Sequence, residues 1–583
     1  MPISAALDLT MQAARLPREQ TPLDHRILRM SLLAAVLGFL AACIARLLTA
    51  LIGLLTNLAF YGRISTDFVS PASNHLGAWV ILVPVAGGII VGLMARYGSK
   101  AIRGHGIPEA IEQILTNDSR IPPRMVYLKP LSAAIAIGTG GPFGAEGPII
   151  ATGGALGSLL GQLLHITPTE RKTLLSAAAA AGMAAIFDSP IAAVVLAVEL
   201  LLFEFKARSL IPVCFAVIVA TIAREGTLGS APVFAMQTVL PQTGGALLLY
   251  VLIGLVTGVA SVWVTRAVYA VEDAFDRLPI HWMWWPAVGG IAVGLIGWWQ
   301  PLTLGVGYTN IEAAIGGQLA VSALLVLCIA KFTSWVIALG SGTSGGTLAP
   351  LFTIGGALGA LLAHATSTLL PTAHINVGVA ALVGMAAMFA GASRALLASV
   401  IFAFETTHQI AALVPLLGGC VAAYLVSSLS MRTTIMTEKI ARRGIRVPSE
   451  YHADFLDGIR VASACSHNVI CMHRTDLVGN TRHWLQSHLP AAAHQGYPLL
   501  DEDGRLCGFI SRREVLDPSI DEEATLASLV RRAPAIITGA HSLSEAADHM
   551  VLEEVGRLIV VDAADEGRVL GMLTRRDLLA AHG

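Results

Sequence analysis

Two glycine-rich segments of this chain repeat each other inside very hydrophobic sequence. Residues 138–161 read GTGGPFGAEGPIIATGGALGSLLG, and residues 340–362 read GSGTSGGTLAPLFTIGGALGALL. In register, Pro148 falls on Pro350, and the double glycines of the two segments coincide. Segments of this kind, interrupted by Gly and Pro at matching positions of two halves, are typical of membrane proteins with a midplane ion or substrate site.

The repeat extends beyond these segments. Downstream, AGMAAIF at 181–187 meets VGMAAMF at 383–389 in the same register. Upstream, GHG at 104–106 matches GVG at 305–307 with a shift of one residue. The chain is therefore predicted to contain two copies of one membrane unit.

Charged residues are scarce and unevenly distributed. They make up 13% of the 583 residues, against about 25% in a typical soluble protein, and the mean hydropathy is +0.68. The stretches 226–265 and 332–393 contain no Asp, Glu, Lys or Arg. Apolar stretches of that length predict several membrane spans rather than a soluble core. After Lys439 the sequence becomes charged, so a soluble C-terminal domain is expected from Thr437 to Gly583.

The flanks predict the orientation of the chain. Basic residues precede the first apolar run at Ser31 and follow the last one; they are Arg15, Arg18, Arg26, Arg29, Arg442, Arg443 and Arg446. Because positive charge favours the cytoplasmic side, both termini are expected there, with no cleavable signal peptide. The seven cysteines include no CxxC pair, so we interpret them as packing residues, with no metal site.

Three helices are expected to begin inside the membrane, at Ile107-Pro108-Glu109, Gly147-Pro148 and Ala349-Pro350. Proline is favoured in a first helical turn, and glycines before it let the backbone approach closely. Helix starts present unpaired N–H groups and the positive end of the helix dipole. Converging starts form an anion site without a fixed cation, and moderate binding lets the ion leave again.

Glycines in such segments can also serve packing or nucleotide binding. For Gly153-Gly154 and Gly355-Gly356, close helix packing is the favoured interpretation. A nucleotide-binding loop is disfavoured because no GK[ST] follows and no soluble βαβ unit surrounds the glycines. A pump or another enzyme is disfavoured because the sequence has neither a Walker loop nor a catalytic constellation.

Three motifs in order resemble the CLC family of chloride channels and proton/chloride exchangers. They read GHGIPE at 104–109, GAEGP at 144–148 and GGTLAP at 345–350. The resemblance implies an all-α polytopic membrane protein with an inverted-topology repeat and broken helices. It also implies a homodimer with one anion pathway per subunit, chloride as the bound ion, contact with membrane lipid and no nucleic-acid partner. A multi-pass protein of a bacterial inner membrane is the expected setting.

Glu146 is the residue that this resemblance makes most important. An ionisable residue inside a membrane is a functional residue by default. A carboxylate at a helix start mimics the permeant anion, and protonation would release it, so the resemblance implies that Glu146 is the gate; a helix-capping role is the alternative. The resemblance places the anion-binding positions at His105, Gly106, Ile107, Thr347, Leu348 and Met436.

Several positions depart from the family pattern. His105 replaces the usual Ser and would add pH sensitivity near neutrality. Met436 replaces a Tyr, which predicts a looser inner constriction; Ala145 replaces an Arg and Leu348 a Phe. Family exchangers usually carry two adjacent glutamates where this chain has Glu199 and Leu200.

Leu200 bears on the choice between two functions. It occupies the proton-coupling position, and a hydrocarbon side chain cannot carry a proton. A passive, voltage-gated-type chloride channel is therefore the favoured prediction. A proton/chloride antiporter stays the alternative, because water can substitute for a side chain in a proton path.

The C-terminal domain contains two similar units, each with a strand-like run followed by a basic helix start. These units, at 461–518 and 524–583, resemble a pair of CBS domains. The second ends GMLTRRD, which places Thr574 and Asp577 at the family's ribose-contacting positions; Ser511 and Glu514 are their counterparts. The resemblance implies an adenine nucleotide at this pair, and a purely structural dimerising module stays the alternative.

The expected domain organisation has five parts. They are an N-terminal segment at 1–26, the transmembrane domain at 27–436 (halves about 27–225 and 240–436), a linker at 437–460, and the two CBS units at 461–518 and 524–583.

Overall fold

The computed structural model describes residues 25–581 except 165, 230, 243, 372–373, 446, 448–455, 457–458, 488 and 566. The chain divides into two compact units, a membrane unit at Leu23–Tyr451 and a C-terminal unit that contains His452–Gly583. The predicted N-terminal segment 1–26, with Arg15 and Arg18, lies outside the described residues apart from its last two positions. The membrane unit continues beyond Met436 through a short helix, α18 (Glu438–Ala441).

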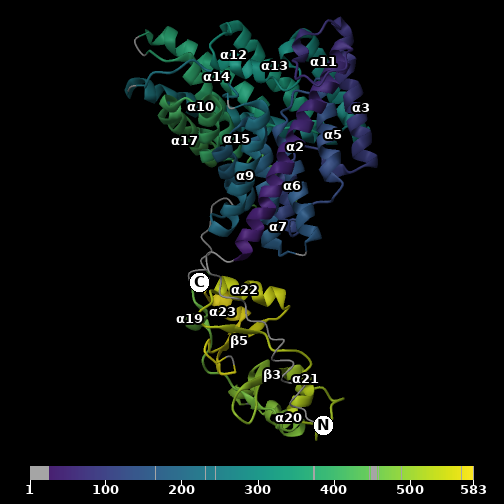
Figure 1. The fold of residues 1–583 in the computed structure, drawn as a ribbon, viewed down its shortest axis with the longest axis vertical. Helices are drawn as coiled ribbons and strands as arrows, with labels where there is room; N and C mark the ends of the chain where they lie inside the picture. The colour runs from purple at the N-terminus through teal and green to yellow at the C-terminus, as the bar shows by residue number, and fades with distance from the viewer. Residues whose placement is uncertain are drawn as a thin grey trace. The chain divides into compact units, whose positions relative to one another are not determined.

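The membrane unit consists of two halves with the same order of helices (Figure 1). The first half contains α2 (His25–Tyr61), α3 (Leu82–Tyr97), α4 (Ile107–Thr116), α5 (Met125–Gly138), α6 (Glu146–Leu163), α7 (Pro168–Phe187), α8 (Pro190–Ala197) and α9 (Ala207–Leu228). The second half contains α10 (Gly244–Asp276), α11 (Trp285–Trp299), α12 (Tyr308–Ile315), α13 (Val321–Gly340), α14 (Leu348–Leu369), α15 (Val377–Ser393), α16 (Leu396–Thr407) and α17 (Leu413–Ser430).

Packing repeats along with the order of helices. Helix α6 packs on α7 as α14 packs on α15, and α2 packs on α9 as α10 packs on α17. Seven helices in the described part of the chain are long and apolar enough to cross a membrane. Others, such as α4 and α12, are too short to span, and broken elements of this kind are tolerated only where protein buries them. The predicted fold class, a polytopic helical repeat protein, is confirmed.

Two glutamates join the halves reciprocally. Glu199, in the short π-helix Val198–Leu202 after α8, accepts hydrogen bonds from the N–H groups of Leu397 (3.0 Å) and Ala398 (3.1 Å) at the start of α16. Glu405 of α16 accepts them from the N–H groups that start α8, at Ile191 (2.9 Å) and Ala192 (2.8 Å). Each carboxylate therefore satisfies orphan N–H groups of the opposite half.

Two buried lysines repeat in the same way. Lys129 of α5 donates to the carbonyl oxygens of Ile102 and Gly104, both at 2.8 Å. Lys331 of α13 donates to those of Thr303 (3.0 Å) and Gly305 (2.8 Å). Both side chains have no exposed surface. Each lysine therefore fixes the glycine-rich loop that precedes the short helix of its own half, α4 or α12.

The C-terminal unit contains two copies of one small α/β arrangement. In the first sheet β1 (Met472–His473) pairs in parallel with β2 (Gly496–Leu500), which pairs antiparallel with β3 (Leu506–Ser511). The second sheet repeats this pattern with β4 (Ile536–Thr538), β5 (Arg557–Val561) and β6 (Val569–Thr574). The accompanying helices are α19 (Val461–Ala464), α20 (Val478–Gln486), α21 (Arg512–Val515), α22 (Leu543–Leu552) and α23 (Arg575–Ala580). The predicted internal repeat of the C-terminal domain is confirmed.

Candidate anion pathway

The three predicted helix starts are present within two residues of their expected positions. Helix α4 begins at Ile107, α6 at Glu146 and α14 at Leu348. The loops before them are hydrogen-bonded to one another: Gly104 N–H donates to Thr343 O (3.3 Å), and Gly346 N–H donates to Gly144 O (2.9 Å). The sequence repeat thus brings motifs far apart in the chain to one place.

Close backbone approach explains the glycines here. A Cβ on Gly346 would lie 2.5 Å from Gly144 O, and one on Gly147 would overlap the carbonyl of His105. Gly106, the residue before α4, has φ of 93°, a conformation that favours glycine. The His105 loop and the starts of α6 and α14 therefore meet at one centre, which is buried in the membrane unit.

Farther along α6 and α14, only one glycine of each pair is packed so closely that a side chain would not fit. A Cβ on Gly153 would overlap Ala178 O, and one on Gly355 would overlap Gly384 O. Gly154 and Gly356 leave more room, with nearest atoms at 3.4 Å and 3.7 Å. One glycine of each pair is thus required for close helix contact.

The side chain of Glu146 folds back into this centre. It has no exposed surface, and a Cβ on Gly346 would lie 3.0 Å from its Oε2. Oε1 accepts a hydrogen bond from the hydroxyl of Tyr308 at 3.0 Å. The backbone N–H groups of Glu146 and Ala349 face the carboxylate. The carboxylate thus lies where two helix starts present their positive ends.

Unpaired polar atoms mark the same centre. Within the described residues, Oε2 of Glu146, Oγ1 of Thr347 and Nδ1 of His105 are buried and have no hydrogen-bond partner. Buried polar groups in native proteins are almost always paired, so several unpaired ones together point to a ligand. A hydroxyl, an imidazole and backbone N–H groups are donors that suit a small anion such as chloride.

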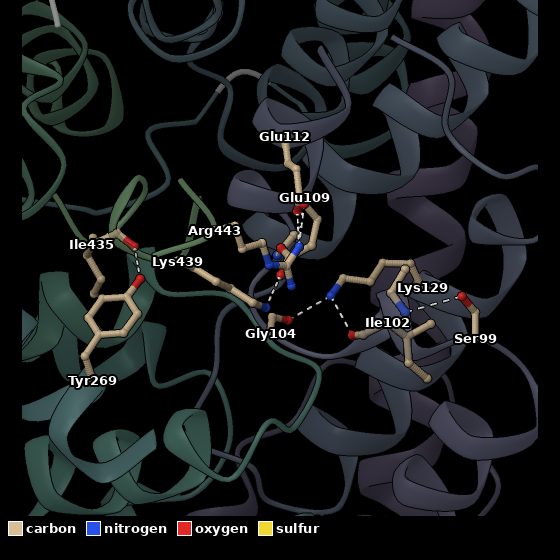
Figure 2. Close-up of polar contacts among 12 residues, drawn as sticks. Ser99, Ile102, Gly104, Glu109, Glu112, Lys129, Tyr269, Ile435, Lys439 and Arg443 are labelled. Carbon is tan, nitrogen blue, oxygen red and sulfur yellow. Dashed lines mark hydrogen bonds and ion pairs between the residues drawn. The ribbon is translucent and has the colours of Figure 1, made fainter. Parts of the chain in front are cut away.

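An ionic network surrounds the start of α4 (Figure 2). Gly106 N–H donates to Glu109 Oε2 at 2.8 Å, and Lys439 pairs with Glu109 Oε1 at 2.7 Å. Lys129 lies beside this pair and binds Gly104 O. Lys439 belongs to α18, so a residue that the sequence assigns to the linker fixes the first motif. Glu109 acts as a capping and ion-pairing residue here.

A tyrosine that sequence reasoning missed contacts the residue next to Met436. Met436 is fully buried. Tyr269 of α10 donates its hydroxyl to Ile435 O at 2.8 Å (Figure 2), and this contact holds the backbone next to Met436. Spacing in the sequence gives no sign of the contact, because 166 residues separate the two partners.

The remaining residues predicted to line the pathway are buried. Ile107 and Leu348 are fully buried at the first positions of α4 and α14, so their backbone N–H groups are the parts available to an anion. Leu200 is buried in the π-helix, next to the capping Glu199. The arrangement therefore leaves the Leu200 position without a titratable side chain.

In the C-terminal unit, Thr574 and Asp577 contact each other. Thr574 donates from its N–H and its hydroxyl to Asp577 Oδ2, both at 2.7 Å. Thr574 also lines a cleft of about 280 Å³ together with Ser466, Asn468, His494 and Arg557. Partial burial lowers the pKa of the Arg557 guanidinium, which nevertheless stays protonated at neutral pH. The cleft thus combines a cation with hydroxyl and amide groups.

Comparison with protein-family models assigns the chain to a class. The model of the voltage gated chloride channel family, Voltage_CLC, matches residues 86–428, and the CBS domain model matches residues 526–582. The protein therefore belongs to the CLC family of anion transport proteins, as the three motifs indicate. It is a multi-pass membrane protein with a C-terminal CBS region.

Among curated proteins, similar sequences carry two kinds of name. A "Putative chloride channel protein ClcB-like" of Ralstonia nicotianae is 28% identical over 62% of this chain and 85% of its own length. An "H(+)/Cl(-) exchange transporter ClcA" of Cronobacter sakazakii is 29% identical over 60% and 77%. Its namesake in Klebsiella pneumoniae is 28% identical over 73% and 91%.

Solved structures support the fold. A slow cyanobacterial Cl−/H+ antiporter matches with a TM-score of 0.64 at 23% identity, covering 71% of this chain and 98% of its own. A eukaryotic CLC transporter matches with a TM-score of 0.62 at 20% identity, covering 95% and 98%. At these identities the likeness concerns the fold alone.

Gly346→Ala tests whether the centre needs close backbone approach. The new Cβ would press on Gly144 O and on the Glu146 carboxylate. Overpacking of this kind costs about 1–3 kcal/mol, so we expect chloride affinity to fall roughly ten- to a hundredfold. Calorimetric titration of the purified protein with chloride measures it. Gly356→Ala, where the nearest atom is 3.7 Å away, is the matched control and should stay near wild type; equal affinities of both variants would contradict the convergence.

Proposed function

We propose that this protein is a proton/chloride exchanger in which Glu146 alternately binds a proton and occupies the anion site. The observation that carries the proposal is the buried Glu146 carboxylate, which lies between the starts of α6 and α14, beside donors that have no partner in the described part of the chain. Relatives named H+/Cl− exchange transporters align with 60% to 73% of the chain. The names of these relatives favour exchange over the passive channel that Leu200 suggests.

Electrostatic repulsion couples the two ions. A carboxylate and a chloride cannot share this centre, because like charges 4 Å apart repel by about 4 kcal/mol inside a protein. Protonation neutralises Glu146 and lets the side chain leave, so chloride can enter. Return of the charged carboxylate expels chloride and requires loss of the proton. Proton and chloride binding therefore alternate at one place.

Leu200 argues against exchange only if every proton must pass through its position. His105 offers another route from the inner side. Its imidazole is buried, and within the described part of the chain its Nδ1 has no partner. Its backbone carbonyl adjoins Gly147 at the start of α6, and the Glu109–Lys439 pair connects this loop to partly exposed side chains. Because an imidazole can bind and release a proton, we assign His105 the role of the inner proton carrier.

The reversal potential in liposomes under crossed chloride and pH gradients tests the exchange. An exchanger responds to both gradients and moves protons uphill when chloride runs downhill, whereas a channel follows chloride alone. Glu146→Gln should abolish proton movement and keep passive chloride flux, because the amide carries no titratable charge. Glu170→Gln, which changes a carboxylate in the first turn of α7, is the control and should keep coupling. A wild-type reversal potential at the chloride equilibrium value under every pH gradient would refute exchange.

His105→Ser tests the inner proton route. Serine keeps a hydrogen-bond donor for the anion but cannot carry a proton at neutral pH. We expect the proton flux per chloride to fall about a hundredfold or more, the size typical for loss of a proton-transfer group, while chloride binding is retained. Glu199→Gln is the matched control: it keeps an acceptor for the start of α16 and should leave the coupling ratio intact. An unchanged ratio in the serine variant would exclude His105 as the carrier.

The proposal extends to assembly and regulation. We infer a homodimer in a bacterial inner membrane with cytoplasmic termini, and an adenine nucleotide in the cleft lined by Arg557 and Thr574. A carboxylate such as that of Asp577 can accept hydrogen bonds from ribose hydroxyls, and Arg557 can pair with phosphate.

Asp577→Asn tests the nucleotide site in the full-length protein. Losing one charge-assisted hydrogen bond costs about 1.5–3 kcal/mol, so we expect ATP affinity in calorimetry to fall roughly tenfold or more. Glu514→Gln, at the corresponding position of the first copy, is the control. Absence of ATP binding to the wild type would favour a purely structural module.

A further inference from the structure

Within the described residues, Tyr308 is the one side chain that donates a hydrogen bond to the gate carboxylate. It is the first residue of α12, and its hydroxyl donates to Glu146 Oε1 at 3.0 Å across 162 residues of sequence. None of the three family motifs contains it. The hydrogen bond therefore comes from a different element than those that form the anion-binding loops.

The ring of Tyr308 is held in position by other aromatic rings. Its centroid lies 5.8 Å from that of Phe187 and 6.1 Å from that of Phe234, both edge-on, and 6.0 Å from the stacked ring of Phe68. Edge-to-face and offset arrangements in this distance range are favourable. The hydroxyl is thus aimed at Glu146 by a rigid support, so the hydrogen bond needs little ordering of the side chain.

The backbone that carries Tyr308 is equally constrained. Gly307, just before it, has φ of 82°, and Lys331 fixes the same loop through Gly305 O. In the repeat register, GVG at 305–307 corresponds to GHG at 104–106, so Tyr308 corresponds to Ile107. The second half therefore contributes a side-chain hydroxyl at the position where the first half contributes a backbone N–H.

We propose that Tyr308 is a latch for the gate: its hydroxyl holds the charged Glu146 carboxylate in the anion site and thereby sets the pH at which the gate opens. A hydrogen bond to a carboxylate is worth about 1.5–3 kcal/mol, against about 0.5–1.5 kcal/mol for one between neutral groups. Tyr308 thus stabilises the charged, closed gate more than the protonated one. This inference rests on the proposed gating role of Glu146.

Other charged groups near the gate stay constant when Tyr308 changes. Lys331 of α13 interacts electrostatically with Glu146. On the inner side, His105, Lys129 and Glu109 surround the start of α4. Helix α14 contains no Asp, Glu, Lys or Arg, and the neighbouring faces of α7 and α16 present Phe187 and Phe402. A shift in pH dependence caused by loss of one hydroxyl is therefore attributable to the latch.

Tyr308→Phe removes the hydroxyl and keeps the ring packing. Because the latch favours the charged gate, its loss should move the half-maximum of chloride flux by about one pH unit to higher pH, the equivalent of a tenfold change in proton affinity. Chloride should also bind up to about tenfold more tightly at pH 8, since the carboxylate competes less well. Flux in liposomes between pH 4 and 9 and calorimetric chloride titration measure the two effects.

Tyr250→Phe is the matched control. This tyrosine is fully buried, whereas Tyr308 is partly buried, and its hydroxyl donates to Gln242 at 2.9 Å, away from the gate. It should leave the pH profile unchanged even if stability falls. The double variant Tyr308→Phe with Glu146→Gln should behave like Glu146→Gln alone, because the latch has nothing left to hold.

The outcomes separate the two proposals. An unchanged pH profile and unchanged chloride affinity in Tyr308→Phe, together with loss of pH dependence in Glu146→Gln, would overturn the latch and keep the gate. Retained pH dependence in Glu146→Gln would overturn the gate itself, and the latch with it. A shift of the Tyr308→Phe profile to lower pH would also overturn the latch, since it would mean that the hydroxyl favours the protonated gate.

Discussion

A polar group inside a membrane must find its partner within the protein, and here each half of the repeat satisfies groups of the other. Glu199 pairs with the N–H groups that start α16, and Glu405 pairs with those that start α8. Such groups would otherwise cost several kcal/mol each in a medium without water. The reciprocal pairs therefore fix the two halves against each other and keep the broken helices at a defined depth.

The centre is the place where this symmetry is broken. In the repeat register Glu146 corresponds to Leu348, and Ile107 corresponds to Tyr308. The first half therefore supplies the carboxylate, and the second half supplies a hydroxyl that contacts that carboxylate. A strictly symmetric centre would have two carboxylates or none. In the exchange proposed here, a carboxylate with a neutral partner is what would let the site alternate between proton and chloride.

The sequence predicts what is local and leaves out what is long-range. Glycine and proline patterns give the starts of α4, α6 and α14, because helix starts depend on neighbouring residues. The internal repeat gives the two-half architecture. Tyr308 and Tyr269 were not predicted, since their partners Glu146 and Ile435 lie 162 and 166 residues away. The capping role of Glu199 was not predicted for the same reason, because its partners at the start of α16 are also far away in the sequence.

Met436 and Leu200 are the two departures from the family pattern that favour a channel. Both favour it less once the long-range contacts of the structure are considered. Met436 lacks the hydroxyl of the family tyrosine, which suggests a loose inner constriction. Tyr269 instead donates to Ile435 O, and Met436 is fully buried beside it, so the Met436 position is held by packing and by a backbone contact. Leu200 lacks a proton site, but His105 introduces a titratable group next to the anion centre. The physical requirement for exchange is that the two ions exclude each other at Glu146, and neither departure removes it.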